Sequence, residues 1–260
     1  MSNAYVDDQT FAPGAFAGNT RALRWLIWSG MVCLAILGPA MLLARVLPLP
    51  AATLSAEQIA HRWVEHKNSI RLGCVLMMLG ISLWATYCAA ISYWIRRMEQ
   101  GVPILTYLSL ILPGTGTVLF LLAPFLWSVA AFRPETMSPD VILALNDAAC
   151  LAFIWLVGPF IIQFALYGIA ILQDKSAPNI FPRWVGYLNI FFSIECFCGL
   201  TTASVKSGPL SWTGVISFWN VMAVFAIWLV TMTVTMLRAL RSLEARQRTV
   251  SESEPVLALR

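Results

Sequence analysis

The residue with the clearest chemical potential in this sequence is Glu195, a carboxylic acid in the middle of a long apolar run. It stands in the segment FFSIECFCG (191–199), and about ten residues of the apolar run flank it on each side. An ionised carboxylate near the middle of a bilayer is costly unless it is paired. Because no Lys or Arg stands in the middle of any apolar run, we expect this carboxyl group to carry a proton and to act through that proton or through a bound cation.

Polar residues in the same part of the chain are candidate partners for Glu195. Asn189 and Ser193 are four residues apart and therefore share one helix face, and Thr202 and Asn220 follow in the sequence. A proton-carrying or ligand-binding site is one interpretation of this group. The alternative is a neutral glutamic acid that only forms a hydrogen bond with a neighbouring helix.

The third apolar run contains a cluster of residues that weaken a helix, namely Pro113, Gly114, Thr115 and Gly116, followed by Pro124. Transporters use broken helices of this kind to present helix ends and carbonyl groups to a substrate or an ion. An ordinary proline kink with glycines for close packing is an equally good interpretation. The Gly-x-Gly spacing is not a nucleotide-binding loop, because no strand precedes it and no Lys follows it.

Two further polar positions have weaker cases for chemistry. Asn146 and Asp147 stand about two turns into the fourth apolar helix. Asp147 could gate a cavity, but an acid at that depth more often marks the wet end of a helix. His61 and Glu65 are four residues apart, yet the chain has only 2 His residues, so we expect no metal or haem site.

The six cysteines fall inside apolar runs, where a structural disulfide framework has no reason to form. Their pattern is neither a Cys-x-x-Cys redox motif nor a zinc ligand set, and we expect free thiols and no cofactor. The residues are Cys33, Cys74, Cys88, Cys150, Cys196 and Cys198.

The elements that position these residues are long apolar helices. Hydrophobic residues make up 59% of the 260 residues and charged residues 12%, whereas a soluble domain carries about 25% charged residues. The apolar runs match the roughly 20 residues that span a bilayer. We predict an all-α, polytopic transmembrane helical bundle with spans at 25–47, 70–95, 102–132, 139–172, 184–205 and 212–237.

A short amphipathic helix is predicted between the first two spans. Ser55 and Gln58 form a capping-box pattern, and Ile59, Trp63 and Ile70 follow at helical spacing. We expect these apolar side chains to rest on the membrane or on the bundle, on the extracytoplasmic side. His61 and Glu65 lie on another face and should remain in water.

The distribution of basic residues predicts the orientation. The side that holds the two termini and the loops after the second and fourth spans carries more Lys and Arg than the other side. This excess favours cytoplasmic termini. We therefore divide the chain into a cytoplasmic tail (1–24), a six-helix transmembrane domain (25–237) and a disordered cytoplasmic tail (238–260). The net charge of +4 does not form a basic stripe, so we expect no nucleic-acid partner.

Three classes of function are compatible with these features. We rank a small-molecule or ion transporter or binding protein first, on the buried acid and the interrupted third span. A noncatalytic accessory or assembly subunit of a membrane complex comes second, with other membrane subunits as partners besides the lipid bilayer. An intramembrane enzyme comes last, because no nucleophile, base and orienting group can be assembled.

Overall fold

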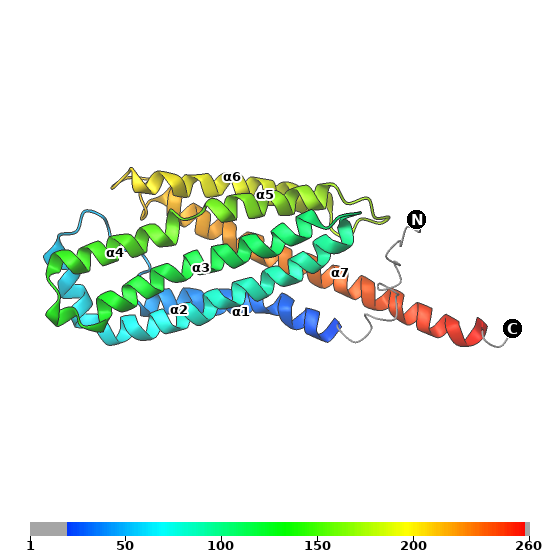
Figure 1. The fold of residues 1–260 in the computed structure, drawn as a ribbon, viewed down its shortest axis with the longest axis horizontal. Coiled ribbons are helices and arrows are strands. Elements are labelled where there is room, and N and C mark those ends of the chain that lie inside the picture. The colour runs from blue at the N-terminus through cyan, green and yellow to red at the C-terminus, as the bar shows by residue number, and fades with distance from the viewer. Residues whose placement is uncertain (1–19, 258–260) are drawn as a thin grey trace, which may run out of the picture.

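A computed structural model describes residues 20–257, with side chains described as far as residue 246. The described part is helical throughout, with short connections (Figure 1). Its main helices are α1 (Thr20–Leu43), α2 (Ala56–Met98), α3 (Ile104–Phe132), α4 (Pro139–Ile154), α5 (Gly158–Leu172), α6 (Arg183–Glu195) and α7 (Val221–Leu257). Three short helices join them: η3 (Pro134–Thr136), η4 (Cys196–Ala203) and the π-helix η5 (Val215–Asn220).

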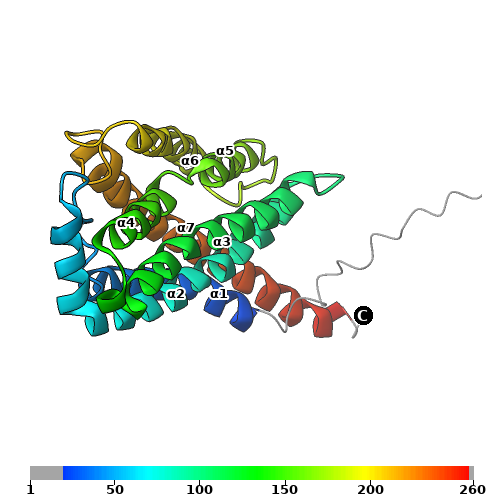
Figure 2. The same cartoon turned by 60° about the vertical axis from the view of Figure 1, so that its left-hand side comes forward.

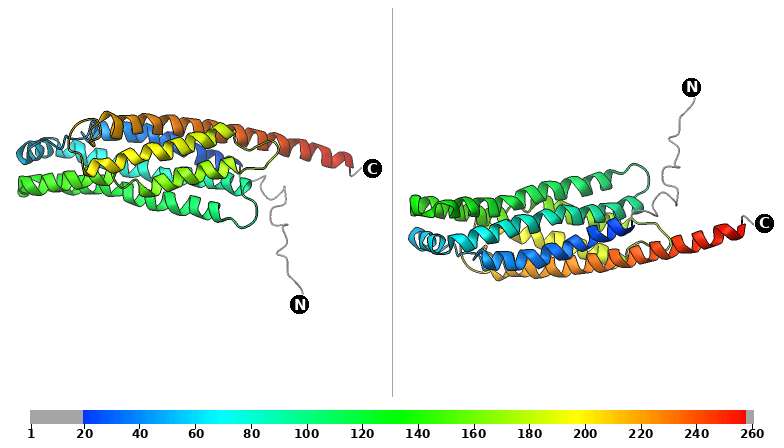
Figure 3. Two further views of the ribbon diagram at one scale, coloured as in Figure 1. Left: turned by 90° about the horizontal axis from the view of Figure 1, so that it is seen from above. Right: turned by 90° about the horizontal axis from the view of Figure 1, so that it is seen from below.

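These helices make six segments that are long and apolar enough to cross a membrane. The spans predicted from the sequence are confirmed, and the protein is a multi-pass membrane bundle. Neighbouring spans run antiparallel along the long axis of the molecule (Figures 1 and 3). The segments are Thr20–Leu43, Ala56–Met98, Ile104–Phe132, Pro139–Leu172, Arg183–Ala203 and Val215–Arg246.

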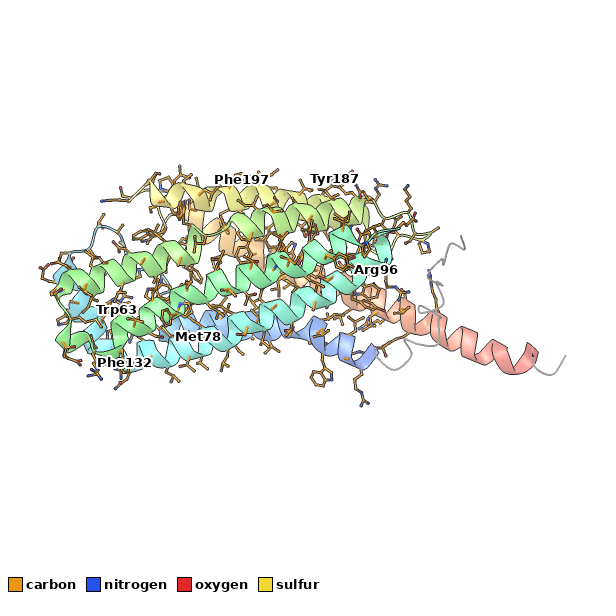
Figure 4. The ribbon with its side chains drawn as sticks, viewed as in Figure 1. Trp63, Met78, Arg96, Phe132, Tyr187 and Phe197 are labelled. Carbon is orange, nitrogen blue, oxygen red and sulfur yellow. The ribbon has the colours of Figure 1, made fainter. Side chains whose placement is uncertain are left out.

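The outer surface of the bundle is apolar, as contact with lipid requires. Phe132, Tyr187 and Phe197 are 62%, 61% and 54% exposed. Their side chains lie on the outside of the bundle in Figure 4. In water, exposed apolar residues on this scale would drive aggregation, whereas in a bilayer they contact acyl chains.

The predicted amphipathic helix is present but is not a separate element. Ser55 caps the first turn of α2, and the capping box with Gln58 is complete. The helix then continues without interruption into the second span, because no Gly or Pro separates the two. Its first turns run across one end of the bundle (Figure 2). Ile59 and Trp63 are buried as expected.

The basic residues of this first part of α2 have local partners. Arg71 donates from Nε to the carbonyl oxygen of Ala131 at 2.8 Å, at the end of α3. Arg62 donates to the carbonyl of Arg45, and Lys67 pairs with Glu135. Cations near helix C-termini are stabilising. These three positive charges therefore join the connections at this end of the bundle.

The segment after Leu237 differs from the disordered tail that we predicted. The helix α7 continues to Leu257. The sequence there is rich in Arg, Glu, Ala and Leu, which favour helices. An ion pair also attaches the helix to α1, since Arg24 Nη2 lies 2.8 Å from Glu244 Oε1.

The interior divides into two clusters of buried side chains along the bundle axis. One is built around Trp228, Phe164 and Tyr167, and we refer to it as the Trp228 cluster. The other is built around Trp127 and Trp63, and we refer to it as the Trp127 cluster. The candidate site lies where the two clusters meet.

Candidate binding site

The fourth span is broken in its middle. Helix α4 ends at Ile154 and α5 begins at Gly158, so Trp155–Val157 is not helical. Pro159 explains the break, because it has no N–H to donate to the carbonyl of Trp155 and suits the first turn of a new helix. From the sequence, a broken helix was one of two interpretations of the third span, and the Gly158–Pro159 pair of the fourth span was overlooked.

Two other spans also lose regular α-helical geometry at this depth. The fifth span changes from α6 to the 3₁₀-helix η4 at Cys196, and the sixth begins as the π-helix η5 before α7. Polar side chains join the two irregular segments. Ser217 donates to the carbonyl of Cys198 at 3.0 Å, and Thr201 Oγ1 lies 3.3 Å from Ser217 Oγ.

Gly199 brings η4 against the break in the fourth span. A Cβ atom at this position would lie 2.8 Å from the carbonyl oxygen of Ile154 and 3.3 Å from Cγ1 of Val157. No side chain fits in that gap, so glycine permits the contact. The irregular segments of three spans therefore lie next to one another.

A cavity of about 90 Å³ lies beside these segments, between the two core clusters. Aromatic rings from five spans line it, including Trp84, Phe120, Phe164, Phe192 and Phe225. Ser217, Cys33 and Cys196 also line it, and no charged side chain of residues 20–246 does. A cavity of this composition favours an apolar occupant.

Trp84 lines the cavity and has a hydrogen-bond donor without an acceptor. It is 5% exposed, and its ring centroid lies 5.3 Å from that of Phe225. Within the described residues, its indole N–H has no hydrogen-bond partner. Buried donors normally have a partner, so this N–H is an exception in the wall of the cavity.

Glu195 ends α6 and is not itself among the residues that line the cavity, but it follows the wall residue Phe192 by three positions and therefore lies on a neighbouring part of the same helix face. Phe192, Cys196 and Gly199 line the cavity from the same segment. The carboxylate of Glu195 accepts a hydrogen bond from the Asn220 side chain, across the seam between α6 and η5. Glu195 is partly exposed and Asn220 is exposed, so the pair lies on the outer, lipid-facing surface of α6 and η5.

The other predicted partners of Glu195 bond elsewhere. Asn189 accepts from Trp228 Nε1 at 2.8 Å and joins α6 to α7. Ser193 donates to the carbonyl of Ile161 at 2.7 Å, and Thr202 donates to that of Gly199 at 2.7 Å. Asn189 and Ser193 thus join helices, and Thr202 bonds within η4, while Asn220 is the one member of the predicted group in contact with the acid.

The third span is an unbroken helix, so the kinked-helix interpretation applies there. Pro113 cannot donate to the carbonyl of Ser109, and the hydroxyl of Ser92 donates to that carbonyl instead at 2.9 Å. Thr115 bonds within its own helix, and nothing lies within 4 Å of the position of an added Cβ at Gly114. Gly116 faces the ring of Phe160, a wall residue of the cavity.

Asp147 lies apart from the cavity. Its Oδ1 accepts from the Nδ2 of Asn146 at 3.2 Å, within α4, and it is absent from the cavity lining. Its position favours the wet end of a helix over a gate. Over residues 20–257, moreover, no group of three or more His, Cys, Asp or Glu side chains is arranged to hold a metal ion.

Sequence reasoning missed the aromatic wall of the site. Trp84, Phe164 and Phe192 look like ordinary apolar span residues, and only the packing of distant spans brings them together. The Gly-Pro pair in the fourth span was a usable sign of the break.

The chain matches no protein-family model, no curated protein and no solved structure in the three comparisons with known proteins. The fold and the site alone therefore define its class, a six-span membrane protein with an aromatic cavity inside the bundle.

Proposed function

We propose that this membrane protein binds a small apolar molecule within the bilayer, as a transporter or carrier of that molecule. The observation that carries the proposal is the convergence of three irregular helix segments on one aromatic cavity. Irregular backbone at membrane depth is tolerated only inside protein or beside a cavity. The π segment at the start of the sixth span adds to this, because π-helical turns occur frequently at functional sites.

The position of Glu195 favours this proposal over an accessory subunit. A subunit that only assembles with others would be expected to seal an acid in its packing. Here the acid is partly exposed where α6 meets η5, next in sequence to the wall residue Cys196. We further propose that both termini lie in the cytoplasm, on the distribution of Lys and Arg.

Binding can be measured by quenching of Trp84 with bromobenzene, a small apolar molecule that carries a heavy atom. The purified protein in lipid nanodiscs is titrated, and the part of the quenching that Trp84→Phe abolishes is assigned to the cavity. Saturable quenching of Trp84 is the expected result. Linear, unsaturable quenching would show simple partitioning into lipid and would contradict the proposal.

A matched pair of variants separates the cavity from the lipid. Val157→Phe adds a ring beside the break in the fourth span and should weaken bromobenzene binding at least about tenfold by filling the cavity. Val118→Phe places the same ring at a position that is 63% exposed on α3. Binding should be unchanged in Val118→Phe, and equal effects of the two variants would rule out the cavity as the site.

A further inference from the structure

The seam between α6 and η5 carries the polar groups of the candidate site. Glu195 and Asn220 meet across it, and each is adjacent in sequence to a wall residue, Cys196 or Val221. Among the residues whose side chains the structure describes, none with a charge lines the cavity. An occupant would thus have apolar surroundings for its body and a carboxyl group beside its outer end.

The carboxyl group of Glu195 has no cationic partner in the described part of the chain. Asn220 is its hydrogen-bond partner, and the salt bridges there join other residues at the ends of the bundle. A carboxylate within the bilayer is strongly stabilised by a nearby positive charge. Asn220 supplies only a neutral amide, so a ligand can supply the missing cation.

From this arrangement we infer that the ligand is an amphiphilic amine, with its apolar body among the aromatic rings and its protonated amine against Glu195. This inference rests on the proposed function and specifies the ligand of the same site. The amine donates to the carboxylate oxygens, and the body contacts Trp84 and Phe225. The seam between α6 and η5, which faces lipid, is the route by which such a molecule enters from the bilayer.

The test compares two probes that differ only in their polar group, 4-phenylbutylamine and 4-phenyl-1-butanol. Each probe competes with bromobenzene for quenching of Trp84, in the wild type and in Glu195→Gln. The glutamine keeps an oxygen that can accept from Asn220 but removes the charge. For each probe, the ratio of its apparent affinities for the wild type and for Glu195→Gln cancels the partitioning of that probe into lipid.

The wild type should bind the amine at least about tenfold more tightly than the alcohol, a difference of about 1.4 kcal/mol. Glu195→Gln should abolish this preference while it keeps bromobenzene binding. Asp147→Asn, which removes an acid of another span outside the cavity lining, should leave the preference intact.

Two negative results have different meanings. Equal competition by amine and alcohol in the wild type, or an unchanged preference in Glu195→Gln, would overturn the amine inference and leave the apolar site in place. Absence of saturable bromobenzene quenching would overturn the proposed function itself, and the amine inference with it.

Discussion

Glu99 shows how a single residue outside the membrane organises the start of a span. Its carboxylate accepts from the backbone N–H groups of Leu105 and Thr106 at 2.7 and 3.0 Å, and from the Thr106 hydroxyl at 2.7 Å. Partial burial opposes ionisation, but these hydrogen bonds and the charge of Arg96 outweigh it and lower the pKa of Glu99. The carboxylate thus stabilises the first turn of α3.

This lowered pKa predicts a pH dependence of stability. The contribution of Glu99 is present above its unfolded-state pKa, about 4.3, and is lost as the pH falls through the lower folded-state pKa. The difference in unfolding free energy between wild type and Glu99→Gln should be constant near neutral pH and shrink in acid. Denaturant titrations from neutral pH down to about pH 3 measure it. A difference that does not change with pH would show that the charge has no role.

The sequence predicted Glu195 as a chemical residue and Asn220 as a partner, and the structure brings these two together. The sequence could not predict that Asn189 and Ser193 would form hydrogen bonds with other helices. Shared helix faces can be read from spacing, but the neighbouring helix that each face meets depends on tertiary packing. The same limit hid Trp84, whose apolar surroundings in sequence resemble those of any span.

Among the elements, α1 and α2 make one of the closest contacts in the bundle. A Cβ added at Gly73 of α2 would lie 2.4 Å from the backbone nitrogen of Ala44 and 2.7 Å from the carbonyl oxygen of Ala40. Small residues at such positions allow membrane helices to approach closely. Backbone atoms cannot move aside as a flexible side chain can.

Gly73→Ala should therefore destabilise the protein by about 1–3 kcal/mol, the usual cost of overpacking. Gly114→Ala is the matched control, because nothing lies within 4 Å of its added Cβ. It should leave stability unchanged or raise it by up to about 1 kcal/mol through helix propensity. Thermal unfolding in detergent compares the two. Equal losses in both variants would mean that close packing at Gly73 contributes nothing specific.

The existence of the spans was predictable from hydropathy, whereas the choice between a break and a continuous helix at each proline was not. Pro113 and Pro159 both stand in apolar runs, yet only Pro159 accompanies a break, at the start of α5, while α3 continues through Pro113. The difference lies in tertiary partners, since Ser92 donates to the carbonyl that Pro113 leaves open. Such a partner belongs to another span and has no signature in the local sequence. The length of α7 beyond the membrane was missed because a polar segment was taken as disordered.

For the whole molecule, the six-span bundle and the proposed orientation predict the side of each loop. Reporters fused after Arg97 and after Arg248 should both give cytoplasmic signals, and a reporter near Glu135 should lie on the opposite side. In this loop the carboxylate of Glu135 forms an ion pair with Lys67. Opposite signals from Arg97 and Arg248 would contradict an even number of crossings between them. Inverted signals at all three sites would keep the bundle and reverse the orientation.

The central claim is that the cavity between the two core clusters receives an apolar molecule. The most direct measurement is the crystal structure of the protein grown with bromobenzene, with the bromine located by its anomalous scattering. We predict a bromine peak among Trp84, Phe160 and Phe225, within the cavity. Bromine peaks confined to the lipid-facing surface, or side chains that close the space between these rings, would contradict the claim.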